Sequence, residues 1–361
     1  MRPVRPVRPR EPKAPWAFAP AKQGVAGPEY SGPVFLVNSL FTFPSRLFPR
    51  RRRLASLVKK WLRSVWRLFR VKKRTADELA RRLDVSLAEL LDWTPSYRET
   101  IISKKRGGTR RLLIPDAKLK ALQRRILHKV LRRLRVHPAA KGFERGQSIV
   151  DNAGPHVGRS VVIKMDIVDF FPSCKAEEVT AYFRKIGWDE AAGVILTKLC
   201  THEGRLPQGA PTSPRLSNLI NWPLDARIAR WVAYRKGAYT RYADDITISF
   251  PKDYPRKVRG VIQQVRRAAR KLGFQIHEQG KLRILRHHQQ QRVTGLVVNE
   301  KLNLPRRLRR LLRAVVHHLQ TGKPASMTAE QLAGWQALAN MVAKGAAKYP
   351  APASPKSPGK P

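Results

Sequence analysis

The sequence predicts an α+β fold, because short strand-forming runs and long amphipathic helical stripes both occur along the chain. Residues 161–165 are rich in β-branched side chains, and residues 246–250 alternate apolar and polar side chains with the period of a strand. Residues 116–135 and 306–319 instead carry apolar side chains at helical spacing, with many Arg between them. We therefore expect a sheet of antiparallel strands packed against helices.

The tetrapeptide Tyr242–Asp245 is the most informative stretch of the chain. It stands between residues 240–241 and the run 246–249, and both flanks favour strands. The segment therefore predicts a hairpin that projects Asp244 and Asp245 at its turn. The alternative is that two adjacent Asp are simply favourable turn residues.

A third carboxylate, Asp166, ends the predicted strand at residues 161–165. With Asp244 and Asp245 it would supply hard oxygen ligands from neighbouring strands. Carboxylates this close repel one another, so they favour binding of divalent cations. Two Mg²⁺ ions, for which Mn²⁺ can substitute, suit such ligands and phosphoryl transfer. The alternative for Asp166 is a cap on the helix that follows the strand.

A loop at residues 206–218 lies between these acidic sites and reads LPQGAPTSPRLSN. An acid after a strand, then PQG-x-P-x-S-P-x-L-x-N, then YADD, in that order, resembles the palm of a reverse transcriptase. The resemblance implies a right-hand polymerase fold, with fingers, a palm built on an antiparallel sheet, and a small helical thumb. It also implies that Asp166, Asp244 and Asp245 are the catalytic and metal-binding residues of an RNA-directed DNA polymerase.

The resemblance further implies that a basic hairpin binds the incoming deoxynucleoside triphosphate. Two basic segments at residues 101–115 are joined by two Gly. In the family, a lysine and an arginine of this hairpin hold the nucleotide. Arg110 matches the arginine, and Lys104 or Lys105 matches the lysine. The alternative is a solvated basic hairpin.

Three further residues match nucleotide-binding positions of the family. Phe171 matches the aromatic residue that excludes a ribose 2′-hydroxyl, which favours deoxynucleotides. Gln208 matches the glutamine that touches the nucleotide, and Lys281 matches the lysine near the pyrophosphate, where it acts as a general acid or as a cation. The alternative for Phe171 is a core phenylalanine.

Two shorter patterns resemble bacterial retron enzymes. Asn152 and His156 belong to an N-A-x-x-H pattern before the first predicted palm strand, and residues 293–295 form the triplet V-T-G. In retron enzymes this triplet opens the thumb and helps to recognise the cognate RNA. The alternative is a hydrogen-bonded loop asparagine and a satisfied histidine. The residues implied to bind RNA, including those of a basic thumb helix, are Asn152, His156, Val293, Thr294, Gly295, Arg306, Arg309 and Arg310.

A retron enzyme would copy a dedicated structured non-coding RNA into single-stranded DNA and leave a branched RNA–DNA product. The resemblance also implies a role in anti-phage defence beside an effector protein. Only residues 296–361 follow the V-T-G triplet, so we expect a host RNase H to trim the template. The alternatives are a diversity-generating, CRISPR-associated or intron-derived reverse transcriptase, or a non-catalytic RNA-binding protein.

Composition agrees with a polyanionic partner. The chain of 361 residues has 73 Lys and Arg against 25 Asp and Glu, a formal net charge of +48, which favours RNA or DNA as partner. The two cysteines form no recognisable disulfide framework, which favours a cytoplasmic location. No apolar run reaches membrane-spanning length.

Composition shifts divide the chain into six predicted parts. Residues 1–45 are a Pro/Arg-rich segment predicted to be disordered, and residues 46–74 a basic amphipathic helix that could lie on RNA, on a membrane or on the enzyme itself. The remaining parts are N-terminal helices and fingers at 75–157, the palm at 158–298, the thumb at 299–344, and a disordered tail at 345–361.

Overall fold

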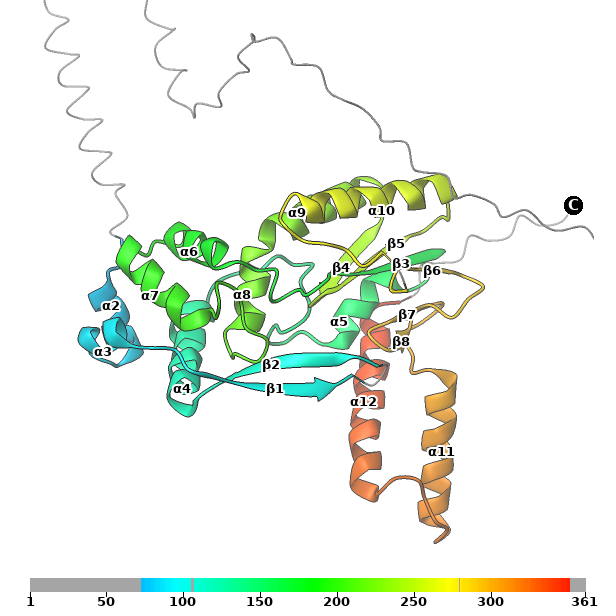
Figure 1. The fold of residues 1–361 in the computed structure, drawn as a ribbon. Coiled ribbons are helices and arrows are strands. Elements are labelled where there is room, and N and C mark those ends of the chain that lie inside the picture. The colour runs from blue at the N-terminus through cyan, green and yellow to red at the C-terminus, as the bar shows by residue number, and fades with distance from the viewer. Residues whose placement is uncertain (1–72, 105–106, 279, 351–361) are drawn as a thin grey trace, which may run out of the picture. The chain divides into compact units, whose positions relative to one another are not determined.

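Four antiparallel strands form the central sheet of the computed structural model, in the order β4-β5-β3-β6 (Figure 1). The structure describes residues 73–104, 107–278 and 280–350. The strands of this sheet are β3 (Val161–Asp166), β4 (Ala238–Tyr242), β5 (Asp245–Phe250) and β6 (Arg283–Arg286). The two-residue alternation puts Ile163 and Ile248 in the main core on one face, while Val162 enters a second core on the other.

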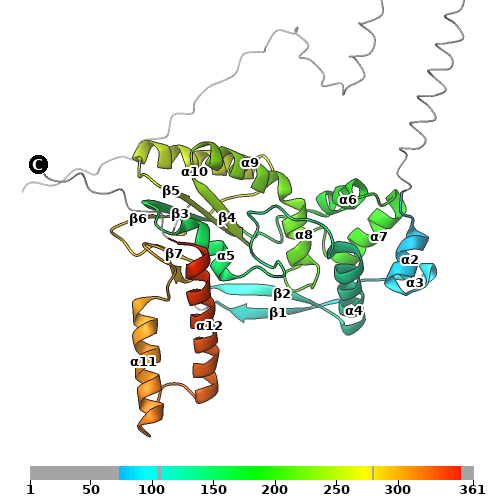
Figure 2. The ribbon, with the colours of Figure 1, turned by 180° about the vertical axis from the view of Figure 1, so that it is seen from behind.

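Helices α9 (Trp222–Tyr234) and α10 (Pro255–Arg270) contact each other and lie along one side of the sheet (Figures 1 and 2). Their apolar stripes supply Ile228, Val232, Val261 and Val265 to the main core. The spacing of these residues follows the helical period, so each helix buries one face and leaves its polar face outside.

Further helices gather beyond one end of the sheet (Figure 1). Thr75 caps the first of them, since its side chain accepts a hydrogen bond from the backbone N–H of Glu78 at 3.3 Å. These helices are α2 (Ala76–Leu83), α3 (Leu87–Asp92), α6 (Ala176–Lys185), α7 (Glu190–Cys200) and α8 (Ser213–Ile220).

The predicted basic hairpin is present as β1 (Tyr97–Ser103) and β2 (Thr109–Pro115). Helix α4 (Ala117–Ile126) and a π-helical turn (Leu127–Leu131) follow it. The helix predicted over residues 116–135 therefore ends early. The carbonyl oxygens of Arg132 and Leu134 accept hydrogen bonds from Arg215 instead of from a further helical turn.

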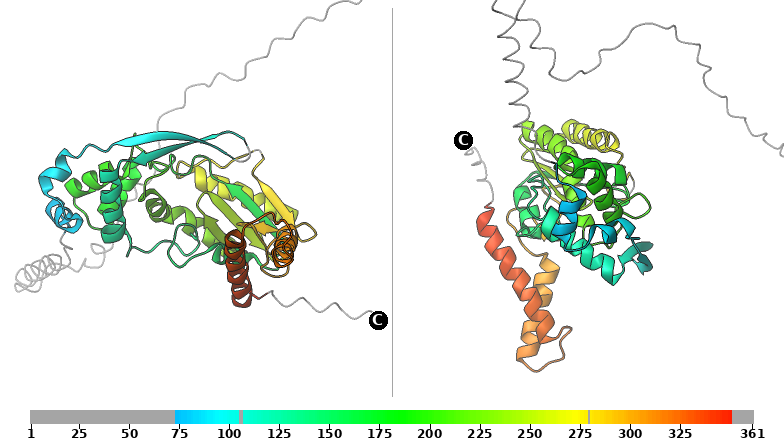
Figure 3. Two further views of the ribbon diagram at one scale, coloured as in Figure 1. Left: turned by 90° about the horizontal axis from the view of Figure 1, so that it is seen from below. Right: turned by 90° about the vertical axis from the view of Figure 1, so that its left-hand side faces the viewer.

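A second core involves the C-terminal helices, which lie side by side in Figure 3. Buried Val293, Leu312, Val315 and Val342 belong to it. The elements around it are α5 (Ile149–Ala153), β7 (Arg292–Val293), β8 (Leu296–Val297), α11 (Arg306–Gln320) and α12 (Ala329–Lys348).

Helix α12 continues past residue 344, where the sequence predicts that the thumb ends. Its last turns pack on α5, because Nζ of Lys348 lies 2.7 Å from Oδ1 of Asp151 and the hydroxyl of Tyr349 donates to the same atom at 3.2 Å. The prediction that the disordered tail begins at residue 345 is thus wrong for residues 345–348, because these contacts fix them as helix.

The predicted segment 1–45 and most of the predicted helix 46–74 lie outside the described residues, as does the chain from residue 351. The last two residues of that predicted helix, Lys73 and Arg74, are not helical, and Arg74 forms a β-bridge with Trp188. In the described part of the chain, no helix has both the length and the apolar character needed to cross a bilayer.

The contact of α12 with α5 predicts opposite effects for two glycines of α12. A Cβ added at Gly345 would lie 2.2 Å from Cγ1 of Val150, whereas one added at Gly334 has no neighbour within 4 Å. Gly345→Ala should lower the free energy of unfolding in urea by about 1–3 kcal/mol through overpacking. Gly334→Ala should raise it by about 0.5–1 kcal/mol, because Ala is the better helix former. Equal effects at both positions would contradict the packing.

Candidate active site

The register of the sheet brings the predicted carboxylates together. Asp166, at the end of β3, is the cross-strand partner of Asp245, at the start of β5, and such partners have Cβ atoms about 4.5–5.5 Å apart. Asp244 immediately precedes β5, and its backbone oxygen accepts a hydrogen bond from the N–H of Ile167 at 3.0 Å. Three acids that are far apart in the sequence therefore meet at one end of the sheet.

The turn between β4 and β5 consists of Ala243 and Asp244, so the predicted hairpin is present, but Asp245 is the first residue of β5 and not part of the turn. Ala243 has a φ of 58°, in the left-handed region that a non-glycine residue rarely adopts. Burial and the nearby carboxylates of Asp166 and Asp245 raise the pKa of Asp244. The turn thus holds a carboxyl group where negative charge accumulates.

Three cationic or potentially cationic groups face these carboxylates. Lys281 forms an ion pair with Asp166, and Nε2 of His277 lies 3.4 Å from Oδ2 of Asp166. Lys164, two residues before Asp166 on β3, has its Nζ 3.5 Å from Oδ2 of Asp245. The alternative for Asp166, a cap on the following helix, is not met. The next helix, α6, begins ten residues later at Ala176, with Lys175 in the capping position.

The donor set fits divalent cations of the Mg²⁺ type. In residues 73–104, 107–278 and 280–350, no three His, Cys, Asp or Glu side chains form a ready-made metal cage. Mg²⁺ does not need one, because it commonly takes one or two carboxylates and completes its shell with water and substrate phosphates. Burial, and then repulsion by Asp166 and Asp245, raises the pKa of Asp244, and such an ion would relieve the repulsive part.

A buried ion pair, which the sequence alone did not suggest, braces the acidic turn. Arg241 is fully buried, and its Nε and Nη2 donate to the two carboxylate oxygens of Asp225 at 2.8 and 2.6 Å. Its Nη1 donates to the backbone oxygen of Ala243 at 3.0 Å and to Asn218 at 3.1 Å. One guanidinium therefore joins helix α9, helix α8 and the turn that carries Asp244.

A close backbone approach supports the same turn. A Cβ added at Gly142 would lie 2.8 Å from the backbone nitrogen of Ala243, so only glycine fits here without displacement. The carbonyl oxygen of Gly142 accepts a hydrogen bond from Asn218 at 2.8 Å. The sequence signals for this brace are an Arg on an inward-facing strand position and one acid, Asp225, on the apolar side of a helix.

Aromatic rings cluster beside the turn. Phe171 is half-buried, with its ring centroid 5.5 Å from that of Phe170 and 5.9 Å from that of Phe143. Phe143, which we did not predict, also lies 6.4 Å from the ring of Tyr242. Phe170 is the core phenylalanine, at 5% exposure, while Phe171 keeps part of its ring accessible near the acids.

The basic hairpin offers unpaired cations. Arg111 is engaged by Glu99 at 2.8 Å and by Glu203 at 3.5 Å. Arg110 and Lys104 are exposed and, within the described residues, form no ion pair. This difference supports Arg110 as the nucleotide-binding arginine, whereas Lys105 lies outside the described residues.

The glutamine loop packs against this hairpin. The backbone oxygen of Gln208 accepts a hydrogen bond from the N–H of Leu113 in β2 at 2.9 Å. A Cβ added at Gly209 would lie 2.6 Å from the backbone oxygen of Leu113. The loop is therefore fixed to the hairpin by its backbone, which leaves the half-exposed side chain of Gln208 available.

The N-A-x-x-H and V-T-G patterns contact each other inside the protein. Nδ2 of Asn152 donates to the hydroxyl of Thr294 at 3.3 Å. The ring nitrogens of His156 lie 2.7 Å from the hydroxyl of Ser249 and 2.9 Å from that of Thr240. Both motifs thus join the second core to the central sheet.

Burial corrects part of the predicted RNA-binding set. Asn152, His156 and Val293 are at most 1% exposed, so direct RNA contact by these side chains is wrong for this structure. Thr294 is half-buried and also donates to the carbonyl oxygen of Ile149, whereas Gly295 is exposed. The alternative is right that hydrogen bonds hold both Asn152 and His156, but Asn152 lies in α5 and not in a loop.

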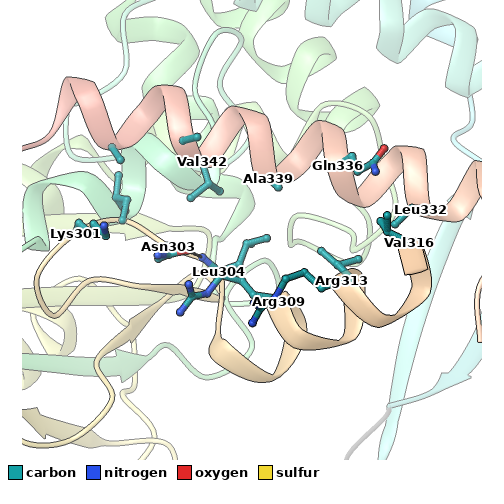
Figure 4. A pocket seen from close by; sticks show the side chains of 14 residues that line it. Lys301, Asn303, Leu304, Arg309, Arg313, Val316, Leu332, Gln336, Ala339 and Val342 are labelled. Atoms are coloured by element: carbon teal, nitrogen blue, oxygen red, sulfur yellow. Dashed lines mark hydrogen bonds between the residues drawn. The ribbon is translucent and has the colours of Figure 1, made fainter. Parts of the chain in front are cut away.

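The predicted thumb arginines remain accessible. Arg306, Arg309 and Arg310 are exposed on α11. Arg309 and Arg313 also border a cavity of about 740 Å³ between α11 and α12, whose walls include Leu312 and Leu332 (Figure 4). The helix is thus basic on its accessible side and apolar where it meets α12.

The buried histidine predicts a specific loss of stability in acid. Burial lowers the pKa of His156 from 6.5 to about 3. Between these values the unfolded chain binds a proton that the folded chain does not, so stability falls as the pH decreases. Between pH 7 and 5 this group should remove about 2 kcal/mol from the free energy of unfolding, at about 1.4 kcal/mol per pH unit well below pH 6.5.

Urea titrations at both pH values should therefore show a smaller decrease for His156→Gln than for the parent. His288→Gln, at an exposed histidine, is the control and should behave like the parent. Equal decreases for the parent and His156→Gln would contradict the buried, neutral state of His156.

Comparisons with known proteins agree with this geometry. The family model described as reverse transcriptase (RNA-dependent DNA polymerase) matches residues 102–298. The Retron Ec86 reverse transcriptase of Escherichia coli is 37% identical over 267 residues, which cover 71% of this chain and 80% of that protein. The Retron Mx162 reverse transcriptase of Myxococcus xanthus is 37% identical over 318 residues, covering 76% of this chain and 65% of that protein.

A second Myxococcus xanthus protein, the Retron Mx65 reverse transcriptase, is 37% identical over 271 residues, covering 68% of this chain. The match spans 62% of that relative, so the chain covers slightly less than two thirds of both Myxococcus proteins. Members of this family are RNA-directed DNA polymerases that generally use divalent metal ions. The order of the motifs, the meeting of three carboxylates and these matches place the chain among the reverse transcriptases of the retron type.

Proposed function

We propose that this chain copies a dedicated structured RNA into DNA at the site formed by Asp166, Asp244 and Asp245. The observation that carries the proposal is the pairing of Asp166 with Asp245 in the sheet, with the half-buried carboxyl of Asp244, whose pKa is raised, beside them. The accessible Arg110 and the half-buried Phe171 are the groups we assign to the incoming deoxynucleotide.

The three carboxylates would hold two Mg²⁺ ions, with Mn²⁺ as a substitute. When bound, such ions activate a primer hydroxyl and neutralise charge on the phosphates. The chain's own side chains mainly position the reactants. Arg110 and Lys104 bind the triphosphate, Gln208 contacts the nucleotide from its loop, and Lys281 neutralises charge where the pyrophosphate leaves.

The parts of a right hand can be assigned to the observed elements. We propose that residues 75–157, with the β1–β2 hairpin, act as the fingers and residues 158–298, with the central sheet, as the palm. Helices α11 and α12, from residue 299 to Lys348, act as the thumb. The exposed Arg306, Arg309 and Arg310 face the template–primer duplex, where they contact phosphates.

The names of the relatives support a retron as the genetic setting. We propose that the template is a cognate non-coding RNA, that the product is a branched RNA–DNA molecule trimmed by a host RNase H, and that the system acts in anti-phage defence with an effector protein.

A cytoplasmic location belongs to the same proposal. Cys174 and Cys200 are free and buried, and burial raises the pKa of each thiol to about 12, so neither is poised to react.

The second candidate is a non-catalytic RNA-binding protein with the same fold and charge. The convergence of all three acids favours catalysis over this alternative, because an unused cluster of carboxylates only costs stability. The retron relatives favour this setting over a diversity-generating, CRISPR-associated or intron-derived one.

Asp244→Asn should abolish extension while leaving RNA binding intact. Loss of a metal ligand should reduce the rate of labelled deoxynucleotide incorporation at least about a hundredfold, since the bound metal contributes several kcal/mol to transition-state stabilisation. Asp92→Asn, at an exposed acid, is the control and should extend like the parent. Undiminished extension by Asp244→Asn would overturn the assignment of this site.

The same variant should also be more stable than the parent in the absence of metal. The pKa of Asp244 is raised in the folded protein. At pH values above the ordinary pKa of an aspartate, its ionised carboxylate therefore lowers the stability of the fold, and the neutral amide of Asn removes this loss. The Tm of metal-free protein at pH 7 should rise in Asp244→Asn, and added Mg²⁺ should raise the Tm of the parent more than that of the variant. A lower Tm for the variant would contradict the electrostatic account.

Phe171→Val should weaken discrimination against ribonucleotides. Removal of the ring opens space beside the sugar, and steric discrimination of this kind is worth about 1–3 kcal/mol. The ratio of kcat/KM for deoxynucleotide and ribonucleotide insertion should therefore fall about tenfold to a hundredfold. An unchanged ratio would show that Phe171 serves only the aromatic cluster with Phe143 and Phe170.

A further inference from the structure

An aromatic and cationic stack lies at the end of α9. The guanidinium carbon of Arg235 lies 3.6 Å from the ring centroid of Trp231 and 5.5 Å from that of Tyr234. Tyr234 is 83% exposed, more than any other large hydrophobic side chain of the described residues. The guanidinium therefore lies against the half-buried ring of Trp231 and near the ring of Tyr234, which is open to solvent.

A similar pair lies at the start of α10. Nζ of Lys257 lies 4.4 Å from the ring centroid of Tyr254, which is 45% exposed. Tyr234 ends α9 just before β4, and Tyr254 follows just after β5. Because Ala238 at the start of β4 pairs with Ser249 near the end of β5, both stacks lie at the same end of the sheet.

This end is opposite to the one that carries the catalytic carboxylates. Strand β4 runs away from Tyr234 toward the turn that bears Asp244, and five residues of strand extend about 15 Å. Helices α9 and α10 also lie on the other side of the sheet from the β1–β2 hairpin and from α11 (Figures 1 and 2). The two stacks are therefore separate from the site where the template–primer duplex is expected.

The surrounding charge is strongly positive. Helix α10 contains no acidic residue, and its exposed cations are Arg256, Lys257, Arg259, Arg267 and Arg270. The single acid of α9, Asp225, is buried and paired with Arg241. Asp253, between β5 and α10, is paired with Arg286 at 2.7 Å. No exposed cation of α9 or α10 has an acidic partner among the described residues.

We propose that Trp231, Tyr234, Arg235, Tyr254 and Lys257 form a second nucleic-acid site, the stacking surface, which binds an unpaired segment of RNA outside the polymerase cleft. Aromatic rings stack on unpaired bases, and neighbouring cations hold the phosphates between them. A base-paired duplex hides its ring faces and gains little from exposed tyrosines. The proposal rests on the proposed function only in that the enzyme works on RNA.

The exposed side chains favour RNA over a membrane. The aliphatic residues of α10, including Val258, Val261 and Ile262, are buried in the protein core. An interfacial helix would need such residues on its outer face to enter the lipid. The stacking surface instead combines polar tyrosine rings with guanidinium and ammonium groups, which suits single-stranded RNA.

The test uses the full chain with its cleft filled by excess RNA–DNA hybrid. Fluorescence anisotropy then measures binding of a labelled oligouridine of about ten nucleotides, within the usual site size for such surfaces. Tyr234→Ala/Tyr254→Ala should bind about tenfold more weakly or worse, because stacking contributes about 1–3 kcal/mol per base and 1.4 kcal/mol is tenfold. Tyr234→Phe/Tyr254→Phe keeps both rings and should bind like the parent.

Primer extension on the hybrid should be unchanged in both double variants, which distinguishes this surface from the polymerase site. Tyr234→Ala alone, at a position that is 83% exposed, keeps the fold and should also weaken binding. Parent-like oligouridine binding by the double alanine variant would overturn the proposal. Equal weakening of oligouridine binding by the alanine and phenylalanine double variants would also overturn it. So would a double alanine variant that lost binding to phosphatidylserine vesicles but kept its binding to RNA.

Discussion

The buried ion pair of Arg241 and Asp225 is the constraint on which the geometry of the acidic turn depends. Both side chains are fully buried, and removing one partner of such a pair typically costs about 3–5 kcal/mol because the other charge is left without compensation. A well-packed apolar pair often gives equal stability, so stability alone does not explain a charged pair here. The additional hydrogen bond from Arg241 to Ala243 gives the reason, since a planar guanidinium fixes a backbone carbonyl in a turn of unusual conformation.

This brace holds the turn against electrostatic repulsion. Asp166, Asp244 and Asp245 share one end of the sheet, and burial together with their proximity raises the pKa of Asp244. A turn free to relax would move the acids apart and relieve the repulsion. Lys281, in contact with Asp166, offsets part of the charge in the metal-free protein. Under the function we propose, the same ammonium group would also neutralise charge on the leaving phosphates, so one side chain would compensate charge both before and during the reaction.

Local patterns predicted the meeting of Asp166, Asp244 and Asp245 because strand period and turn chemistry act over a few residues. The period of two fixes the face on which Asp166 and Asp245 lie, and the hairpin then brings them together. Burial depends on the whole fold, which explains the error at Asn152, His156 and Val293: a short motif does not reveal whether its side chains point into a core. The end of α12 was missed for the same reason, since Lys348 and Tyr349 are ordered by Asp151, about two hundred residues earlier.

The distribution of charge bears on how so basic a chain would distinguish unpaired RNA from duplex under the function we propose. Many of the 25 acids have internal partners, as Asp225, Asp253 and Glu144 show, so the outer surface is more uniformly positive than the composition suggests. Uniform positive charge attracts any polyanion and is screened by salt. Selectivity must then come from groups that recognise more than phosphate. Exposed rings such as Tyr234, which distinguish unpaired bases from duplex, provide this at a surface where further cations add affinity without discrimination.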